Sequence, residues 1–89
     1  MIKLKAVEPK GDYHLLLHFS DSTAGVYDFA PFVAANTVMT QPLSEPEFFA
    51  RYFIELGALG WPNGFDLSTG ALQKRLRDLG ALHQDPEAA

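Results

Sequence analysis

The sequence contains no cysteine among its 89 residues. Disulfide bonds, thiolate metal sites and cysteine nucleophiles are therefore excluded. The lack of cysteine is compatible with a reducing compartment, and we expect the protein to be cytoplasmic. No apolar run approaches the ~20 residues that a membrane-spanning helix needs. The first residues, MIKLKAVEPKGD, lack the apolar centre of a secretory signal, so we expect neither secretion nor a membrane partner.

Positive charge is also scarce. Seven lysines and arginines stand against eleven aspartates and glutamates, which gives a net charge of −4. A protein that binds nucleic acid needs a basic patch to neutralise phosphates. The best cluster is Lys74, Arg75 and Arg77, and Asp78 follows it at once. We interpret this cluster as the solvated face of an amphipathic helix and expect no direct nucleic-acid partner.

Patterns that indicate catalysis are lacking as well. The glycines between residues 57 and 64 have no P-loop lysine, and no nucleophile elbow surrounds a serine. His14 and His18 lie on a predicted strand, where residues four apart share a face but stand roughly 13 Å apart. That distance is too long for one metal ion, so we interpret both as part of an exposed strand face. We expect no catalytic residue, no metal and no cofactor, and an enzyme is the weaker hypothesis.

The first third of the chain shows the alternation of apolar residues that is typical of β-strands. Strands are predicted within residues 2–8, 13–19 and 24–29, with short turns between them. Consecutive strands joined by short turns form an antiparallel meander. In the middle strand one face carries Tyr13, Leu15, Leu17 and Phe19, and the other carries His14, Leu16 and His18.

Two short helices are predicted in the middle of the chain. Asp28 can cap a helix over residues 31–35, which Asn36 would end. Ser44 is the predicted N-cap of the second helix, with Pro46 in its first turn.

The rest of the chain predicts a strand, an extended piece and a longer helix. The strand covers residues 52–56 and the extended piece residues 58–61. Ser68 or Asp66 caps the helix, and Gly80 ends it. Its apolar stripe consists of Leu72, Leu76 and Leu79, with Leu82 as a further candidate member.

These elements predict an α+β fold with an antiparallel sheet of four to five short strands, short middle helices and a C-terminal helix packed on the sheet. We assign residues 1–82 to a single α+β domain and residues 83–89 to a flexible polar tail. The predicted core consists of Leu4, Leu15, Leu17, Phe19, Val26, Phe29, Phe48, Phe53, Ile54, Trp61, Leu67, Leu72 and Leu76.

The stretch GWPNGFDLS holds the only tryptophan of the chain and the best candidate binding residues, which are Trp61, Asn63, Gly64 and Asp66. Each also has a structural explanation. Pro62 and Asn63 suit the two central positions of a β-turn, Gly64 tolerates a positive φ, and Asp66 can cap the next helix. We favour the interpretation as a turn and cap over a ligand site.

The same stretch resembles the signature of the DUF2442 family, small bacterial proteins of unknown function. The segments DYHLLLHFSDS and PLSEPEFFARYFIELGALGWPNGFDLS are similar to that family's opening hairpin and middle, and the resemblance covers most of residues 2–76. Ser68 and Thr69 stand where the family often has proline or glutamate, and a serine still serves as an N-cap. The resemblance implies an α+β domain without established catalytic residues. It also implies a cognate small protein encoded nearby and an antitoxin-like or regulatory role.

Two functions remain open from the sequence. The first is a non-enzymatic interaction module, supported by the resemblance, the acidic charge and the expectation of free sheet edges. The alternative is a small-molecule binding or catalytic protein with its site around Trp61, Asn63, Gly64 and Asp66. A homodimer through a sheet edge or the leucine stripe is compatible with both.

Overall fold

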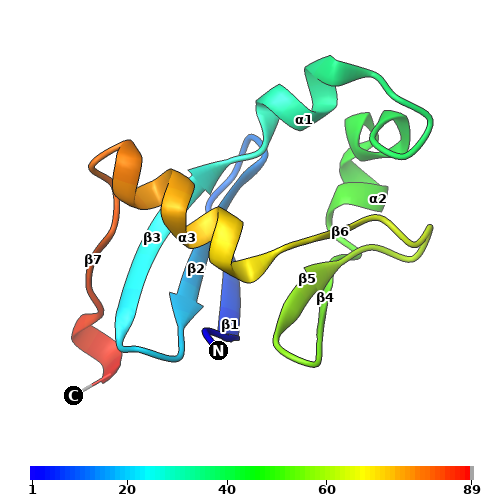
Figure 1. Cartoon of the computed structure of the whole chain (residues 1–89). Coiled ribbons are helices and arrows are strands. Elements are labelled where there is room, and N and C mark those ends of the chain that lie inside the picture. The colour runs from blue at the N-terminus through cyan, green and yellow to red at the C-terminus, as the bar shows by residue number, and fades with distance from the viewer. Residues whose placement is uncertain (89) are drawn as a thin grey trace.

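The N-terminal part of the chain forms the predicted antiparallel meander (Figure 1). The computed structural model describes residues 1–88. Its first strands are β1 (Leu4–Pro9), β2 (His14–Phe19) and β3 (Thr23–Asp28). The register places Leu15 beside Tyr27, and Leu17 beside Gly25, so these residues share the face that packs on the core.

A fourth strand completes this sheet. Strand β7 (His83–Gln84) pairs with the beginning of β3, which gives the order β1-β2-β3-β7. The 3₁₀-helix η2 (Pro86–Ala88) follows it. The sequence predicted a flexible tail over residues 83–89, whereas His83 and Gln84 pair with the sheet and Asp85 is buried against it. Residue 89 lies outside the described part of the chain.

Three further strands form a second antiparallel sheet. They are β4 (Phe53–Glu55), β5 (Ala58–Gly60) and β6 (Asp66–Leu67), in that order. The α+β class is thus confirmed, with the strands divided between two sheets. The carbonyl oxygen of Gly57, between β4 and β5, accepts a hydrogen bond of 2.8 Å from the backbone N–H of Leu4. This bond connects the second sheet to the edge of the first.

Short helices connect the two sheets. Helix α1 (Ala30–Ala35) ends at Asn36 in a left-handed conformation, as predicted, and the Asp28 carboxylate accepts the Ala30 N–H. The 3₁₀-helix η1 (Gln41–Ser44) precedes α2 (Pro46–Phe49). The prediction of Ser44 as an N-cap is wrong, because its hydroxyl donates backwards to the Gln41 carbonyl.

Helix α3 (Thr69–Asp78) lies across the core face of the meander (Figure 1). Ser68 is its N-cap and accepts the Ala71 N–H at 3.2 Å, while the rival cap Asp66 lies in β6. Leu79 is 71% exposed, so the buried part of the predicted stripe ends at Leu76. None of the helices among residues 1–88 is long and apolar enough to cross a membrane.

The core lies between the two sheets, α3 and the middle helices. Most of the predicted core residues are buried, and Phe48 and Leu67 pack against it half-buried. Three predictions are wrong: Val26 and Phe53 lie on the outer faces of their sheets, and Ile54 lies on an edge strand. The sequence prediction missed the buried residues Ala24, Tyr27, Leu43, Phe49 and Leu59.

Two glycines give a matched test of this packing. A Cβ at Gly25 would lie 2.5 Å from the Ala81 carbonyl oxygen, so Gly25→Ala must push the segment that follows α3 away from β3. We expect a loss of about 1–3 kcal/mol in the free energy of unfolding. Gly70→Ala adds its Cβ at an ordinary distance of 3.8 Å from Ile2 and should gain about 0.5–1 kcal/mol. Urea unfolding of both variants measures the contrast, and equal effects would contradict the close packing at Gly25.

Candidate functional site

The WPNG loop is a hydrogen-bonded turn. The Gly64 N–H donates to the Trp61 carbonyl at 3.0 Å, which places Pro62 and Asn63 at the two central positions, as predicted. Gly64 has a φ of +91°, a backbone conformation that residues with a side chain rarely adopt. The Asn63 amide accepts the Phe65 N–H and donates to the Met39 carbonyl at 3.0 Å. Both polar ends of Asn63 therefore stabilise the loop.

Trp61 is part of the aromatic core. Its side chain is 1% exposed, and its indole N–H donates to the Phe49 carbonyl at 2.9 Å. The rings of Phe29, Phe49 and Phe65 surround it at centroid distances of 5.7–5.9 Å. The indole N–H is thus already paired with the backbone, and Trp61 contributes packing at this position.

The outer face of the second sheet carries a hollow of about 340 Å³. Leu59 is buried opposite Ile54, so the other face presents Phe53 beside Gly60, which has no side chain. The hollow forms in this gap. Its lining includes the apolar side chains of Phe53, Leu56 and Phe65, the carboxylates of Glu55 and Asp66, and also Trp61 and Gly64. Three of the four predicted binding residues border it, and Asn63 does not.

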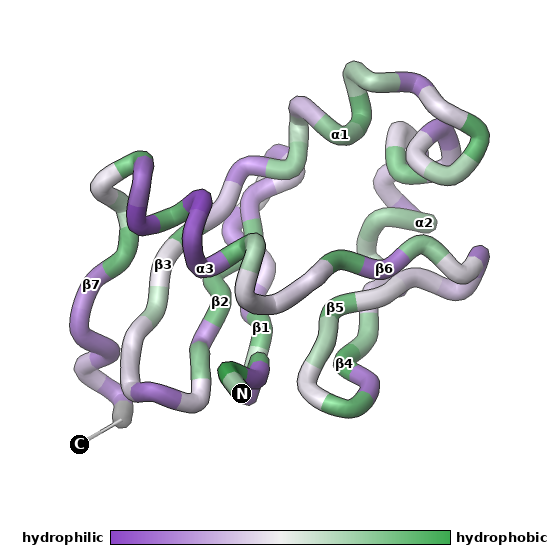
Figure 2. Tube along the Cα trace, viewed as in Figure 1, coloured by the Kyte–Doolittle hydropathy of each residue, from purple (hydrophilic) through white to green (hydrophobic). Residues whose placement is uncertain are grey.

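A tight turn with an unusual residue closes this sheet. Leu56 and Gly57 connect β4 to β5 with φ values of +53° and +81°, which is the pattern of a type I′ hairpin turn. Glycine, asparagine and aspartate are the residues that favour such turns. Leu56 instead holds a left-handed backbone and exposes 93% of its surface. The tip of the β4–β5 hairpin is accordingly hydrophobic in Figure 2.

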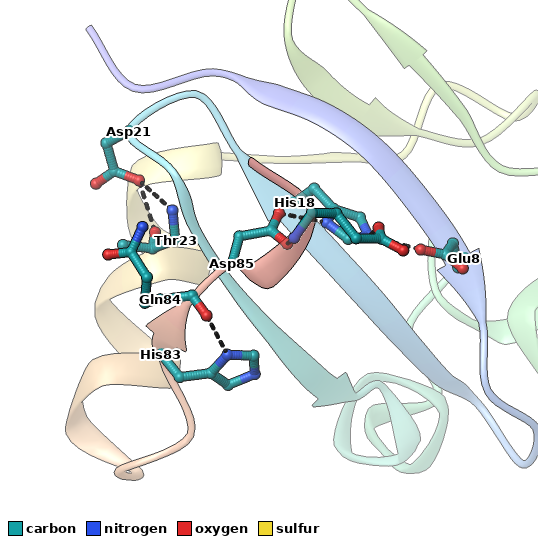
Figure 3. A network of polar contacts seen from close by, with 8 residues as sticks. Glu8, His18, Asp21, Thr23, His83, Gln84 and Asp85 are labelled. Atoms are coloured by element: carbon teal, nitrogen blue, oxygen red, sulfur yellow. Dashed lines mark hydrogen bonds and ion pairs between the residues drawn. The ribbon is translucent and has the colours of Figure 1, made fainter. Parts of the chain in front are cut away.

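A second cluster of polar side chains lies on the outer face of the meander (Figure 3). His18 Nδ1 is 2.6 Å from an Asp85 carboxylate oxygen, and His18 Nε2 is 2.6 Å from a Glu8 carboxylate oxygen. A carboxylate oxygen of Glu87 lies 3.7 Å from the same Nε2. The ligand atoms of Glu8, His18 and Glu87 all lie within 4.8 Å of one another. The cluster therefore joins β1 and β2 to the C-terminal segment.

The expectation of an exposed His18 is wrong. Its side chain is 9% exposed and that of Asp85 is 6% exposed, because the segment after β7 folds over this face of the sheet. His14, four residues earlier, stays 41% exposed. Strand alternation and the hairpin register already place Glu8 near His18, since Glu8 pairs with Leu16. No comparable signal in the sequence identifies Asp85.

Hydrogen bonding controls the charges in this cluster. The hydrogen bond that Asp85 accepts from His18 raises the pKa of His18 above its ordinary value of 6.5, against the effect of burial, and the hydrogen bond with Glu8 raises this pKa further. The same His18 contact lowers the pKa of Asp85 below its ordinary value of 3.8. The charged forms of both residues are therefore favoured together.

Comparison with known proteins identifies one family. The family model described as a protein of unknown function, DUF2442, matches residues 4–77. No curated protein and no solved structure matches the chain. The matched segment includes the β4–β5 hairpin and the hollow on the second sheet, as well as Glu8 and His18. It ends before Asp85 and Glu87.

The His18–Asp85 contact predicts how stability depends on pH. A raised pKa in the folded state means that the stabilisation by His18 is complete below pH 6.5 and is lost as pH rises through that raised value. The lowered pKa of Asp85 means that its stabilisation is present above pH 3.8 and is lost as pH falls through the lowered value. Urea unfolding in chelator-treated buffer should therefore show this pair stabilising the fold most between these two pH values.

The variant Asp85→Asn should flatten the decline at high pH. His83→Gln should change the profile much less, because the hydrogen bond from His18, and not the charge of His83, is the main cause of the lowered pKa of Asp85. A profile of Asp85→Asn identical to that of the unsubstituted chain would show that the pair does not control the pH dependence.

Proposed function

Because the chain belongs to the DUF2442 family, whose function is unknown, we propose a function from its own surface: it is a non-enzymatic interaction module. In this proposal a partner protein binds the hairpin patch, which we define as Phe53, Ile54 and Leu56. The observation that carries the proposal is the conformation of Leu56. The antitoxin-like or regulatory role implied by the family resemblance is one form of this function.

Leu56 is unfavourable in the free protein for two reasons. A left-handed backbone at a residue other than glycine costs of order 1–3 kcal/mol, and such strain tends to occur at functional sites. Its apolar side chain also gains nothing from burial, since it is 93% exposed. Asparagine at the same position would remove both costs. Contact with a partner would bury the Leu56 side chain and so remove the cost of its exposure, which supports a binding role for this turn.

The surroundings of Leu56 indicate the chemistry of the partner. Phe53 is 41% exposed beside the hollow, so an apolar side chain of a partner can enter there. Glu55 and Asp66 line the same hollow with negative charge. A partner with basic residues around an apolar anchor matches this arrangement, and the net charge of −4 favours its approach. We therefore propose a small basic protein encoded nearby as the partner.

A small molecule in the hollow is the second candidate function. The position of Gly64 and Asp66 in its lining favours this candidate. The indole N–H of Trp61 cannot contribute, since it is bonded to the Phe49 carbonyl. A ligand would therefore depend on the two carboxylates and would be cationic.

The variant Leu56→Asn separates binding from folding. Asparagine suits the first position of a type I′ turn, so the melting temperature should stay the same or rise. Loss of the exposed Leu56 side chain should weaken partner binding about tenfold or more. The measurement is isothermal titration of the chain with the protein encoded by the adjacent gene, after co-expression has established the complex. Binding should also weaken at high salt, because the proposed charge contacts are screened.

Leu79→Asn is the matched control, because Leu79 is also an exposed leucine but lies at the end of α3. It should leave partner binding unchanged. Equal affinity of Leu56→Asn and the unsubstituted chain would contradict binding through the hairpin patch. Light scattering that shows only monomers, with no complex on co-expression, would contradict the interaction module itself.

A further inference from the structure

The outer face of the meander holds a hollow of about 230 Å³ that is separate from the hairpin patch. Its lining comes from both ends of the chain and consists of Lys5, Ala6, Glu8, His18, Asp85 and Glu87. The donor atoms of Glu8, His18 and Glu87 converge within 4.8 Å. Three ligands from β1, β2 and η2 thus meet at one point of the folded chain.

His18 distinguishes this cluster from ordinary surface acids. Its imidazole is 91% buried by the fold, and a carboxylate that is itself buried, Asp85, lies 2.6 Å from Nδ1. With Nδ1 held in this way, the ring directs Nε2 towards Glu8 (Figure 3), and a carboxylate oxygen of Glu87 lies 3.7 Å from the same nitrogen. Histidines that bind metals use the same arrangement, in which the second nitrogen donates to a carboxylate.

We propose that Glu8, His18 and Glu87 bind one divalent transition-metal ion, with Asp85 as the positioning residue of His18. One imidazole nitrogen and two carboxylate oxygens form a donor set that suits Zn²⁺, with water in the fourth position. Calcium and magnesium prefer sites made only of oxygen ligands, so the imidazole disfavours them.

The geometry needs only small movements of flexible side chains. Ligands at about 2.0–2.2 Å in a tetrahedral zinc site lie roughly 3.3 Å from one another. Nε2 is 2.6 Å from the Glu8 oxygen and 3.7 Å from the Glu87 oxygen. On zinc binding the Glu8 oxygen would therefore move slightly away from Nε2, and the Glu87 oxygen would move slightly towards it. Both can move, because their side chains are 46% and 71% exposed.

The local charge also favours a cation. Glu8, Asp85 and Glu87 bring three carboxylates to the hollow, and Lys5 is the lysine in its lining. An ion bound by Nε2 takes the place of the proton that His18 otherwise shares with Glu8. The bound ion would tie η2 to the first two strands and stabilise the folded chain by mass action.

Zinc titration of the full chain tests the site. After treatment with chelator, calorimetry with ZnCl₂ should show one ion per chain, and the melting temperature should rise with zinc concentration. The nitrogen NMR signals of His18 should shift on binding, with Nε2 as the ligating atom. The double variant with His14→Gln and His83→Gln leaves His18 as the sole histidine and should bind zinc with unchanged affinity.

Substitutions of the carboxylates identify the ligands. Glu8→Gln and Glu87→Gln should each weaken zinc binding at least about tenfold, and Asp85→Asn should weaken it about 10- to 100-fold through the orientation of His18. The nitrogen signals of Asp85→Asn in the absence of zinc should show an altered His18 tautomer, a change that loss of packing alone would not produce. Glu47→Gln is the control, since Glu47 is an exposed acid on α2.

The proposal is overturned if both Glu8→Gln and Glu87→Gln retain the affinity of the unsubstituted chain, or if zinc leaves the His18 signals unshifted. Failure of Asp85→Asn to fold would not protect the proposal, because the two glutamine variants change exposed or half-exposed side chains and keep the His18–Asp85 contact.

Discussion

The carbonyl oxygen of Gly57 connects three parts of the chain. It accepts the backbone N–H of Leu4 at 2.8 Å and the hydroxyl of Thr69 at 2.7 Å. These donors belong to the first strand of one sheet and the first turn of α3, while Gly57 itself lies in the hairpin of the other sheet. Gly57 can point its carbonyl in this direction because its φ is +81°. Leu56 is held in its left-handed conformation next to this junction, so the exposed tip of the hairpin is a fixed feature of the fold.

The aromatic core explains why the WPNG loop has its sequence. Trp61 packs among Phe29, Phe49 and Phe65, and its N–H satisfies the carbonyl of Phe49. The turn that follows must reverse the chain within three residues to bring Phe65 back onto the indole, which requires the positive φ of Gly64. The motif by which the chain resembles its family is therefore explained by packing. The strands on either side of this loop also form the neighbouring surface, because Phe53 of β4 and Asp66 of β6 line the hollow there.

Local sequence patterns predicted the features that depend on residues close together in the chain, which are the strands of the meander and the helix cap. Alternation identified the meander, and Ser68, the N-cap in the structure, was one of the two caps predicted for α3, because strand faces and caps depend on residues a few positions apart. Burial depends on distant segments and was harder to predict. Phe53 has strand character and is exposed, since it lies on the outer face of its sheet beside the hollow of about 340 Å³. His18 is polar and is buried, because residues 67 positions later fold over it.

The two proposed sites have different origins in the chain. The hairpin patch lies wholly within the segment that matches the family, and so do Glu8 and His18. Asp85 and Glu87 lie beyond residue 77, where the match ends. The polar cluster is thus completed by a segment outside the matched part, which β7 places over the sheet by pairing with β3. A family member whose chain after α3 lacks a carboxylate at the position of Asp85 would keep the same hairpin but leave Nδ1 of this histidine without its carboxylate partner. In this way the two proposed sites can vary independently on one fold.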